Sequence, residues 1–244
     1  MGNYVILGGT GGIGSALCRQ LAEEGAQLYV GARDETRLAA LAAETGAHTL
    51  VLDATSFAQV DDLFAKAKAE LGRIDGAACC VGSLILKPAH TTIEAEWMQT
   101  VMQNLTSAFA TVRGAARTMT GNPEGGSIAL VSSVAARIGL SNHEAIAAAK
   151  GGINGLTLSA AATYARSKIR VNAVAPGLVR TPLADPLTAN EVMLKASTQM
   201  HPLGRIGEPE DVASLLAWLL NPAHSWITGQ IIGADGGLGS VKAR

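Results

Sequence analysis

The feature that most constrains this chain is a cluster of glycines near its start. Five of the seven residues 8–14 are glycine, in the order Gly-Gly-Thr-Gly-Gly-Ile-Gly. An apolar, β-rich run over 4–8 leads into the cluster, and a helix-patterned run follows from Ser15. Glycines at such a junction allow a tight turn, and the helix behind them presents free N–H groups to an anion such as a pyrophosphate. Glycine clusters are also common in ordinary turns, but the order strand, loop, helix favours a dinucleotide-binding loop.

The rest of the chain alternates short apolar runs with longer helix-patterned runs. This alternation predicts βαβ units, and therefore an α/β fold with a Rossmann-type, doubly wound parallel sheet of about seven strands. Because no repeat, linker or low-complexity segment interrupts it, we expect one dinucleotide-binding and catalytic domain over residues 1–244. The expected strands are 4–8, 27–32, 48–53, 76–82, 127–133, 169–177 and 229–237, and the later helices include 145–165 and 211–220.

Composition narrows the class of protein. Hydrophobic residues make up 48% of the chain and aromatic residues only 4%, which suits a buried parallel sheet covered by helices. The formal net charge of −1, without a basic stripe or an aromatic platform, disfavours nucleic acid or an anionic membrane as partner.

Three cysteines, Cys18, Cys79 and Cys80, are too few for a disulfide framework. With no secretory leader and no apolar run of about 18 residues, we expect a cytoplasmic protein. No metal site is expected.

The least regular stretch of the sequence, Arg180 to Arg205, follows directly after an expected strand. Open α/β sheets bind their ligands beyond the carboxyl ends of the strands, so this stretch is predicted to cover a substrate. An apolar substrate pocket would be lined by Leu84, Ile85, Leu178, Leu183 and Leu187.

The spacing G-x-x-x-G-x-G over residues 8–14 resembles the short-chain dehydrogenase/reductase family, in particular its 3-oxoacyl-ACP reductase-like group. The resemblance extends over the whole chain. Asp53-Ala54 resembles the adenine-contacting pair, Asn104 the helix asparagine, and residues 79–82 stand where the family usually has N-N-A-G. Further matches are IRVNAVAPGLVRTP from residue 169, PLGRIGEPEDVA from residue 202 and ITGQIIGADGG from residue 227.

The resemblance implies a nicotinamide dinucleotide. NAD-binding members place an acidic residue at the end of the second strand, where Ala32 stands here. The following Arg33 can hold a 2′-phosphate bidentately, with Arg37 one turn further on, so NADP(H) is favoured over NAD(H). The alternative is that Arg33 is a solvated charge, since the glycine loop has no basic residue at Gly11. The expected cofactor contacts are Gly8, Thr10, Gly12, Ile13, Gly14, Arg33, Asp53, Ala54, Val81, Gly82, Lys150, Pro176, Gly177, Val179 and Thr181.

The family reduces carbonyls with a serine, a tyrosine, a lysine and an asparagine. Ser133, Lys150 and Asn104 match three of these, and the family spacings from Ser133 and from Lys150 both place the tyrosine at Ile146. A second Y-x-x-x-K pattern, at Tyr164 and Lys168, is followed at once by an expected strand and lies too far from Ser133. We therefore assign it to a helix end and a turn.

An isoleucine can neither donate a proton nor stabilise an oxyanion. The expected substitutes are His143, Glu144, or a water held by Lys150 and Ser133, although His143 also fits an ordinary loop residue. The Cys79-Cys80 pair is interpreted as two small hydrophobes rather than a redox centre.

Two functions therefore remain open. The first is an NADP(H)-dependent oxidoreductase that reduces a small apolar carbonyl or enone with a proton donor other than tyrosine. The second is a catalytically silent NADP(H)-binding protein with a regulatory or scaffolding role. The alanine-rich run 145–165 corresponds to the helix through which family members form dimers within homotetramers; alternatively it only covers the sheet.

Overall fold

The computed structural model describes residues 2–242, which contain one parallel sheet of seven strands. The strand order is β3-β2-β1-β4-β5-β6-β7, so the order reverses between β1 and β4. This topology confirms the predicted Rossmann-type α/β fold, and open α/β sheets bind their ligands beyond the carboxyl ends of the strands at such a reversal. The strands are β1 (Asn3–Leu7), β2 (Gln27–Ala32), β3 (His48–Val51), β4 (Gly76–Cys79), β5 (Gly126–Val131), β6 (Ile169–Pro176) and β7 (Ile231–Ala234).

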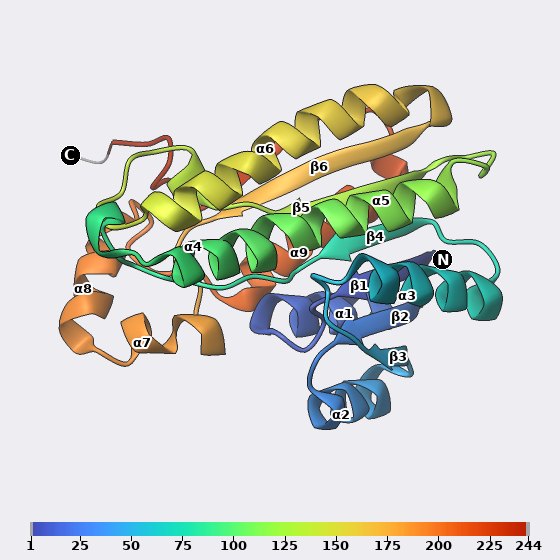
Figure 1. Ribbon diagram of the computed structural model, residues 1–244, viewed down its shortest axis with the longest axis horizontal. Helices are drawn as coiled ribbons and strands as arrows, with labels where there is room; N and C mark the ends of the chain where they lie inside the picture. The colour runs from blue at the N-terminus through green and yellow to red at the C-terminus, as the bar shows by residue number, and fades with distance from the viewer. Residues whose placement is uncertain (1, 243–244) are drawn as a thin grey trace.

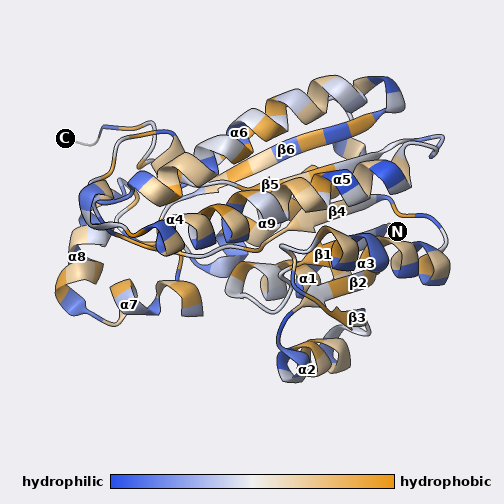
Figure 2. Ribbon diagram, in the orientation of Figure 1, coloured by the Kyte–Doolittle hydropathy of each residue, from blue (hydrophilic) through white to orange (hydrophobic). Residues whose placement is uncertain are grey.

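Helices cover both faces of the sheet (Figure 1). One face carries α1 (Gly12–Glu23), α2 (Glu35–Thr45) and α9 (Pro209–Leu220), and the other carries α3 (Phe57–Leu71), α5 (Ser107–Met119) and α6 (Glu144–Tyr164). Alternate residues of each strand enter the two cores, so Val5 packs on one side and Ile6 on the other. Because both faces are buried, β1 and β2 are hydrophobic along most of their length (Figure 2).

A break in helical geometry precedes α5. Helix α4 (Glu94–Val101) continues into a π-helical turn over Met102–Thr106 and then into α5. Such turns insert one residue into the regular ladder and occur frequently at functional sites. Single 3₁₀ turns span Ala89–Thr91, Val134–Ala136, Ala165–Ser167, Pro182–Ala184 and Pro222–His224.

The stretch between residues 180 and 205, which was expected to be irregular, is partly helical. It contains two helices, α7 (Asp185–Thr188) and α8 (Glu191–Met200), which lie beyond the carboxyl ends of the strands at the left of Figure 1. Helix α8 begins after Asn190, whose side-chain oxygen accepts hydrogen bonds from the N–H groups of Val192 and Met193 at 3.0 and 3.1 Å. An asparagine before a helix is a favourable N-cap, so the segment is ordered by a local signal.

Several expected elements have different ends in the structure. Strands β3, β4, β5 and β7 stop earlier than predicted, because the residues after them turn out of the sheet. Helix α9 starts at Pro209, two residues before its predicted start, and proline is favourable at that first position. Within residues 2–242, no helix has the length and apolar character required to cross a bilayer.

Candidate active site

The glycine loop is a tight turn between β1 and α1. Gly8 has a φ of 76°, in the left-handed region that favours glycine, and its N–H donates to the Gly31 carbonyl at 2.8 Å. A Cβ on Gly14 would collide with the Gly8 carbonyl oxygen. The loop can therefore turn this sharply only because both positions lack a side chain.

The same loop lies against two other strand ends. A Cβ on Gly8 would be 2.8 Å from the Val81 nitrogen, and a Cβ on Gly12 would be 2.6 Å from Cγ2 of Thr181. Residues that follow β1, β4 and β6 therefore meet at one edge of the sheet. Backbone this close to bare glycines, at the N-terminus of α1, suits the pyrophosphate of a dinucleotide.

Two arginines follow the end of β2. The side chain of Asp34 caps α2 by accepting the Arg37 N–H at 2.9 Å, so the turn between Ala32 and α2 is well defined. Arg33 and Arg37 are both exposed, and neither forms an ion pair with any residue in the described range 2–242. Both guanidinium groups are therefore available to a phosphate.

The adenine-contacting pair of the sequence analysis comes just after β3. Asp53 is exposed, and its carboxylate accepts the N–H and the hydroxyl of Thr55, each at 2.9 Å. Ala54 is buried.

Lys150 is a buried cation on α6. Lys150 is only 6% exposed. Its Nζ donates a hydrogen bond of 2.7 Å to the carbonyl of Val131, the last residue of β5. A Cβ on Gly82 would be 3.7 Å from Nζ, so the ammonium lies beside the segment that follows β4. Burial lowers the pKa of Lys150 to about 8. A charge that titrates near neutrality can hold an anion and can also release a proton.

Asn104 is fully buried in the π-helical turn and faces the same segment. Its Oδ1 accepts the Ser83 N–H at 3.2 Å, and its Nδ2 donates to the Ser83 hydroxyl at 2.9 Å. A Cβ on Gly82 would be 3.1 Å from Oδ1. Gly82 thus lies between Asn104 and Lys150, and the structure brings these two predicted site residues to one place.

Ser133 follows β5 and begins a 3₁₀ turn, where its hydroxyl accepts the Ala135 N–H at 3.1 Å. The preceding Ser132 is the residue that connects this segment to α6. Its hydroxyl donates to Oδ1 of Asn154 at 2.6 Å and lies 3.3 Å from the Lys150 carbonyl oxygen. Nδ2 of Asn154 in turn donates to Ala136 at 3.4 Å.

Ser132, Ser83 and Asn154 were not predicted from the sequence. Asn154 stands four residues after Lys150, on the same helix face. That spacing was the available signal for Asn154, whereas Ser83 had none apart from its place after a strand end.

Ile146 lies one helical turn before Lys150 and is 4% exposed. His143 precedes α6, and its Nδ1 lies 2.7 Å from the Ser141 carbonyl. Within residues 2–242, no hydrogen bond connects His143 to Ser133 or Lys150, and Glu144 is exposed.

Two of the cysteine thiols, those of Cys18 and Cys80, have raised pKa values. All three are free; burial raises the pKa of Cys18 to about 12 and raises that of Cys80 well above its usual value. This favours the interpretation of these thiols as small hydrophobes.

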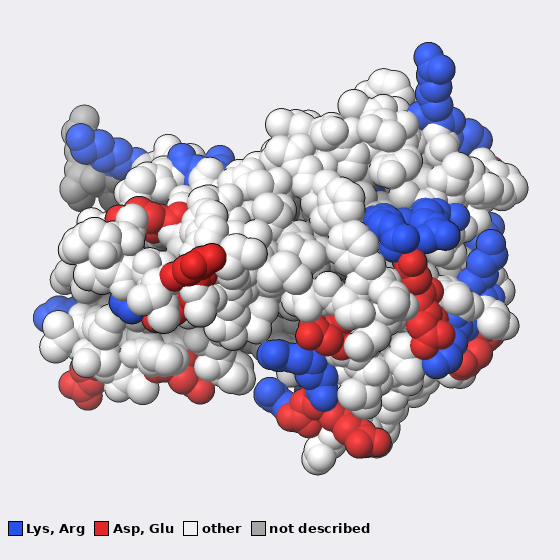
Figure 3. All heavy atoms as spheres, viewed as in Figure 1, with Lys and Arg blue, Asp and Glu red and all other residues white. Residues whose placement is uncertain are grey.

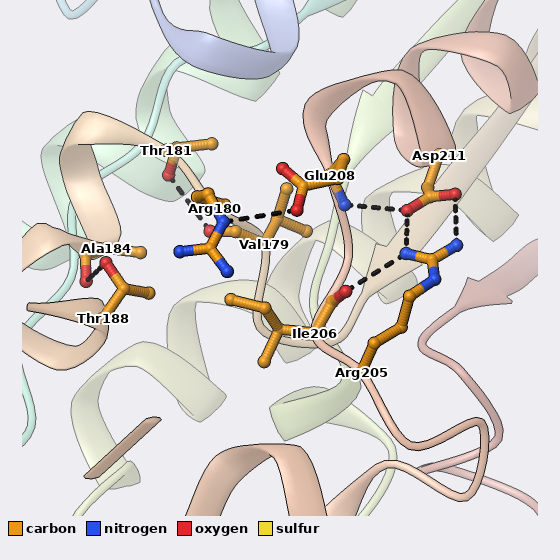
Figure 4. A network of polar contacts seen from close by, with 9 residues as sticks. All are labelled: Val179, Arg180, Thr181, Ala184, Thr188, Arg205, Ile206, Glu208 and Asp211. Carbon is orange, nitrogen blue, oxygen red and sulfur yellow. Dashed lines mark hydrogen bonds and ion pairs between the residues drawn. The ribbon is translucent and has the colours of Figure 1, made fainter. Parts of the chain in front are cut away.

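The segment beyond β6 is fastened by ion pairs (Figure 4). Arg180 pairs with Glu208 at 3.2 Å, and both Nη atoms of Arg205 bond to Asp211, at 2.5 and 2.8 Å. The Arg205 hydrogen bonds lower the pKa of the Asp211 carboxyl to about 2. These pairs hold the start of α9 beside the loop that contains Val179 and Thr181.

The predicted pocket residues are only partly enclosed. Leu84, Ile85, Leu178 and Leu187 are half-buried, and Leu183 is 51% exposed. The alternative Tyr164 and Lys168 pattern lies at the opposite edge of the sheet, where Lys168 ends the turn before β6 with a φ of 57°. Its Nζ donates to the Pro123 carbonyl at 2.9 Å, away from the residues described above.

Comparison with known proteins gives a consistent result. A family model described as enoyl-(acyl carrier protein) reductase matches residues 8–239. A cis-4-hydroxycyclohexanecarboxylate dehydrogenase from Sinomonas cyclohexanicum is 37% identical over 242 residues, which cover 97% of this chain and 96% of the relative. A tropinone reductase homolog from Arabidopsis thaliana is 36% identical over 239 residues, covering 96% and 90%.

Solved structures agree with these relatives. Actinorhodin polyketide ketoreductase, in a structure with NADPH, superposes with a TM-score of 0.93 at 27% identity and covers 98% of both chains. A short-chain type dehydrogenase/reductase from Mycobacterium ulcerans gives a TM-score of 0.92 at 30% identity, covering 97% of this chain and 89% of that chain. The matched family model, the relatives and the fold together show that this chain belongs to the short-chain dehydrogenase/reductase family.

Proposed function

We propose that this protein is an NADP(H)-dependent oxidoreductase that reduces a small apolar carbonyl or enone with a proton donor other than tyrosine. The observation that carries the proposal is the buried Lys150, which lies beside Gly82 and the Ser132 segment at the edge where the glycine loop ends. Its burial at a converging set of strand ends is typical of a functional group rather than a surface lysine.

The residues present fit a nicotinamide dinucleotide. The bare backbone at Gly8, Gly12 and Gly14 provides a cradle that any Cβ would fill, and Thr181 closes its far side. The exposed and unpaired Arg33 supports a 2′-phosphate, and hence NADP(H) rather than NAD(H). When bound, the nicotinamide supplies a hydride to the substrate carbon.

This chain's own residues would then stabilise the charge that develops on the substrate oxygen. The Lys150 ammonium and the Ser133 hydroxyl are the donors proposed for that oxyanion. With Ile146 at the tyrosine position, the proton is proposed to come through a water held by Lys150 and Ser133. The exposure of Glu144 and the local hydrogen bond of His143 make those two groups weaker candidates.

A second function is favoured by one specific observation. The buried Ile146 side chain offers no acid one turn before Lys150, which fits a silent NADP(H)-binding protein whose cofactor regulates a partner. Both functions require the same cofactor, so turnover must distinguish them.

The experiment uses purified full-length protein, NADPH and a panel of small ketones and enones. Turnover in the parent that falls by about 100-fold or more in Lys150→Met supports the oxidoreductase. NADPH binding with turnover only in Ile146→Tyr supports the silent protein instead. Absence of NADPH binding in a folded parent would overturn both.

We also propose that the α4 to α6 face contacts a second copy of this chain. Large apolar side chains are exposed on it, namely Trp97, Met98, Met102, Phe109 and Leu158. A Cβ on Gly151 or Gly155, one turn apart on α6, would have no neighbour within 4 Å, so another helix can approach closely there. Figure 3 shows a broad uncharged band across the middle of this face. Several exposed apolar side chains on one uncharged face support self-association.

A further inference from the structure

His201 is a buried histidine that the proposed chemistry does not use. It follows α8 and is 4% exposed. Its Nε2 lies 3.2 Å from the Leu178 nitrogen, and its Nδ1 lies 2.7 Å from the Ser197 carbonyl oxygen. Because a backbone N–H can only donate, Nε2 must accept, and therefore Nδ1 carries the proton and donates to Ser197. Both bonds form only with this neutral tautomer.

The Leu178 amide belongs to the loop that follows β6. Pro176, Gly177, Val179 and Thr181 in this loop are the expected contacts of the cofactor, and Leu178 lies between them. A Cβ on Gly177 would collide with Nε2 of His201. The imidazole thus occupies the space that the missing side chain leaves, and the ring and the glycine fit as a pair.

The bond to Ser197 connects the same imidazole to the last turn of α8. The His201 side chain therefore connects α8 to the loop after β6. Gly236, just after β7, also lies beside the ring, because a Cβ there would be 3.6 Å from Cδ2 of His201.

The charged groups that line the cavity beside His201 have partners. A cavity of about 400 Å³ beside the ring is lined by Arg205 and Asp211, which pair with each other, and by Asp235. The Asp235 carboxylate accepts the N–H groups of Gly237 and Gly239 and lies 3.8 Å from Arg137. On α8 itself, Glu191 is exposed and Lys195 extends from the same helix.

We propose that His201 is a positioning residue that, in its neutral form, holds the loop Pro176–Thr181 and α8 together and thereby sets the affinity for the cofactor. The inference rests on the proposed function, because it assumes that this loop contacts NADPH. Protonation of Nε2 would direct an N–H at the Leu178 N–H, which removes the bond and separates the loop from α8.

The first test measures the dissociation constant of NADPH for the full-length parent, His201→Gln and His90→Gln from about pH 8 to about pH 5, the range in which imidazole titrates. Glutamine retains an acceptor but does not titrate, and His90 is an exposed histidine of the 3₁₀ turn Ala89–Thr91. We expect affinity to fall about ten-fold more on acidification in the parent and in His90→Gln than in His201→Gln, as expected for loss of about one hydrogen bond. A His201→Gln profile that follows the parent would overturn the proposal.

The second test needs no cofactor. The loss in free energy of unfolding caused by Gly177→Ala is measured with denaturant, once in the parent and once in His201→Ala. Amide exchange at Leu178 is followed in the parent. We expect Gly177→Ala to be strongly destabilising in the parent and far less so in His201→Ala, since the clash partner is then absent. Equal destabilisation in both backgrounds, or an unprotected Leu178 amide at pH 8, would overturn the contact. A parent that binds no NADPH but retains this coupling would instead contradict the proposed function.

Discussion

A single buried ammonium gives the proposed reaction its dependence on pH. Burial lowers the pKa of Lys150 to about 8, so the charged, proton-donating form dominates below that value and is lost above it. We therefore expect kcat/KM of the parent to fall as the pH rises through about 8. The measurement is a pH profile of NADPH oxidation with the best ketone of the panel.

Lys150→Arg is the matched variant for this profile. Arginine stays charged to a pH above about 12, so the alkaline fall should disappear even though the rate is lower. If Lys150→Arg shows the same alkaline limb as the parent, another group is responsible for it.

The choice of cofactor depends on one exposed arginine. A guanidinium that binds the 2′-phosphate makes charge-assisted hydrogen bonds, and at a solvent-exposed site their loss should weaken NADPH binding by roughly ten-fold. We expect Arg33→Ala to raise the dissociation constant of NADPH and to leave that of NADH unchanged, by calorimetry. Arg166→Ala removes another exposed arginine, near the opposite edge of the sheet, and serves as control. If Arg33→Ala weakened the binding of NADH as much as that of NADPH, the assignment of Arg33 to the 2′-phosphate would be contradicted.

The residues that sequence could predict are those whose chemistry follows from local order. Gly8, Gly12 and Gly14 were expected because a turn between a strand and a helix requires them, and the structure gives each a close neighbour in the backbone or in Thr181. His201 was not predicted, because its contact with the Leu178 N–H depends on how α8 folds back on the loop after β6.

At the scale of elements, the N-cap of α8 stabilises the segment that we propose covers the substrate. Asn190 accepts two backbone N–H groups, and loss of such a cap costs about 1 kcal/mol of helix stability. We expect Asn190→Ala to raise KM for the ketone several-fold with little change in kcat, together with faster amide exchange in α8. Ser56→Ala removes the cap of α3, whose hydroxyl accepts the Gln59 N–H, and should lower only the unfolding temperature. An unchanged KM in Asn190→Ala would show that α8 does not cover the substrate.

Element positions were predictable where periodicity is strong. The strand runs and helix α6 follow from apolar patterning, and α6 differs from its expected span by one residue at each end. The π-helical turn at Met102–Thr106 could not be predicted, because a single inserted residue leaves the apolar pattern of α4 and α5 nearly unchanged. Helix α8 was missed although Asn190-Glu191 is a recognisable start, since the stretch was judged by its irregular apolar spacing alone.

At the scale of the whole molecule, a parallel sheet brings distant segments to one edge. Residues that follow β1, β4, β5 and β6 meet there, although more than 160 positions separate Gly12 from Thr181 in the 244-residue chain. The opposite edge has its own cavity of about 930 Å³, which contains Lys168 but none of the residues proposed for the chemistry. The direction of the strands thus separates Lys150, the lysine proposed for the chemistry, from Lys168.

The assembly proposed for the α4 to α6 face leads to the last prediction. Leu158 is 55% exposed on α6, beside the open positions Gly151 and Gly155, so a second copy packing there would bury it. We expect the parent to sediment at twice the monomer mass or more, and Leu158→Glu to shift the distribution toward monomer, because an unpaired carboxylate would then be buried in the contact. Val192→Glu introduces the same charge at a side chain that is 79% exposed on α8 and should leave the assembly intact. A parent that sediments as a monomer, or a Leu158→Glu variant that assembles like the parent, would show that this face only covers the sheet.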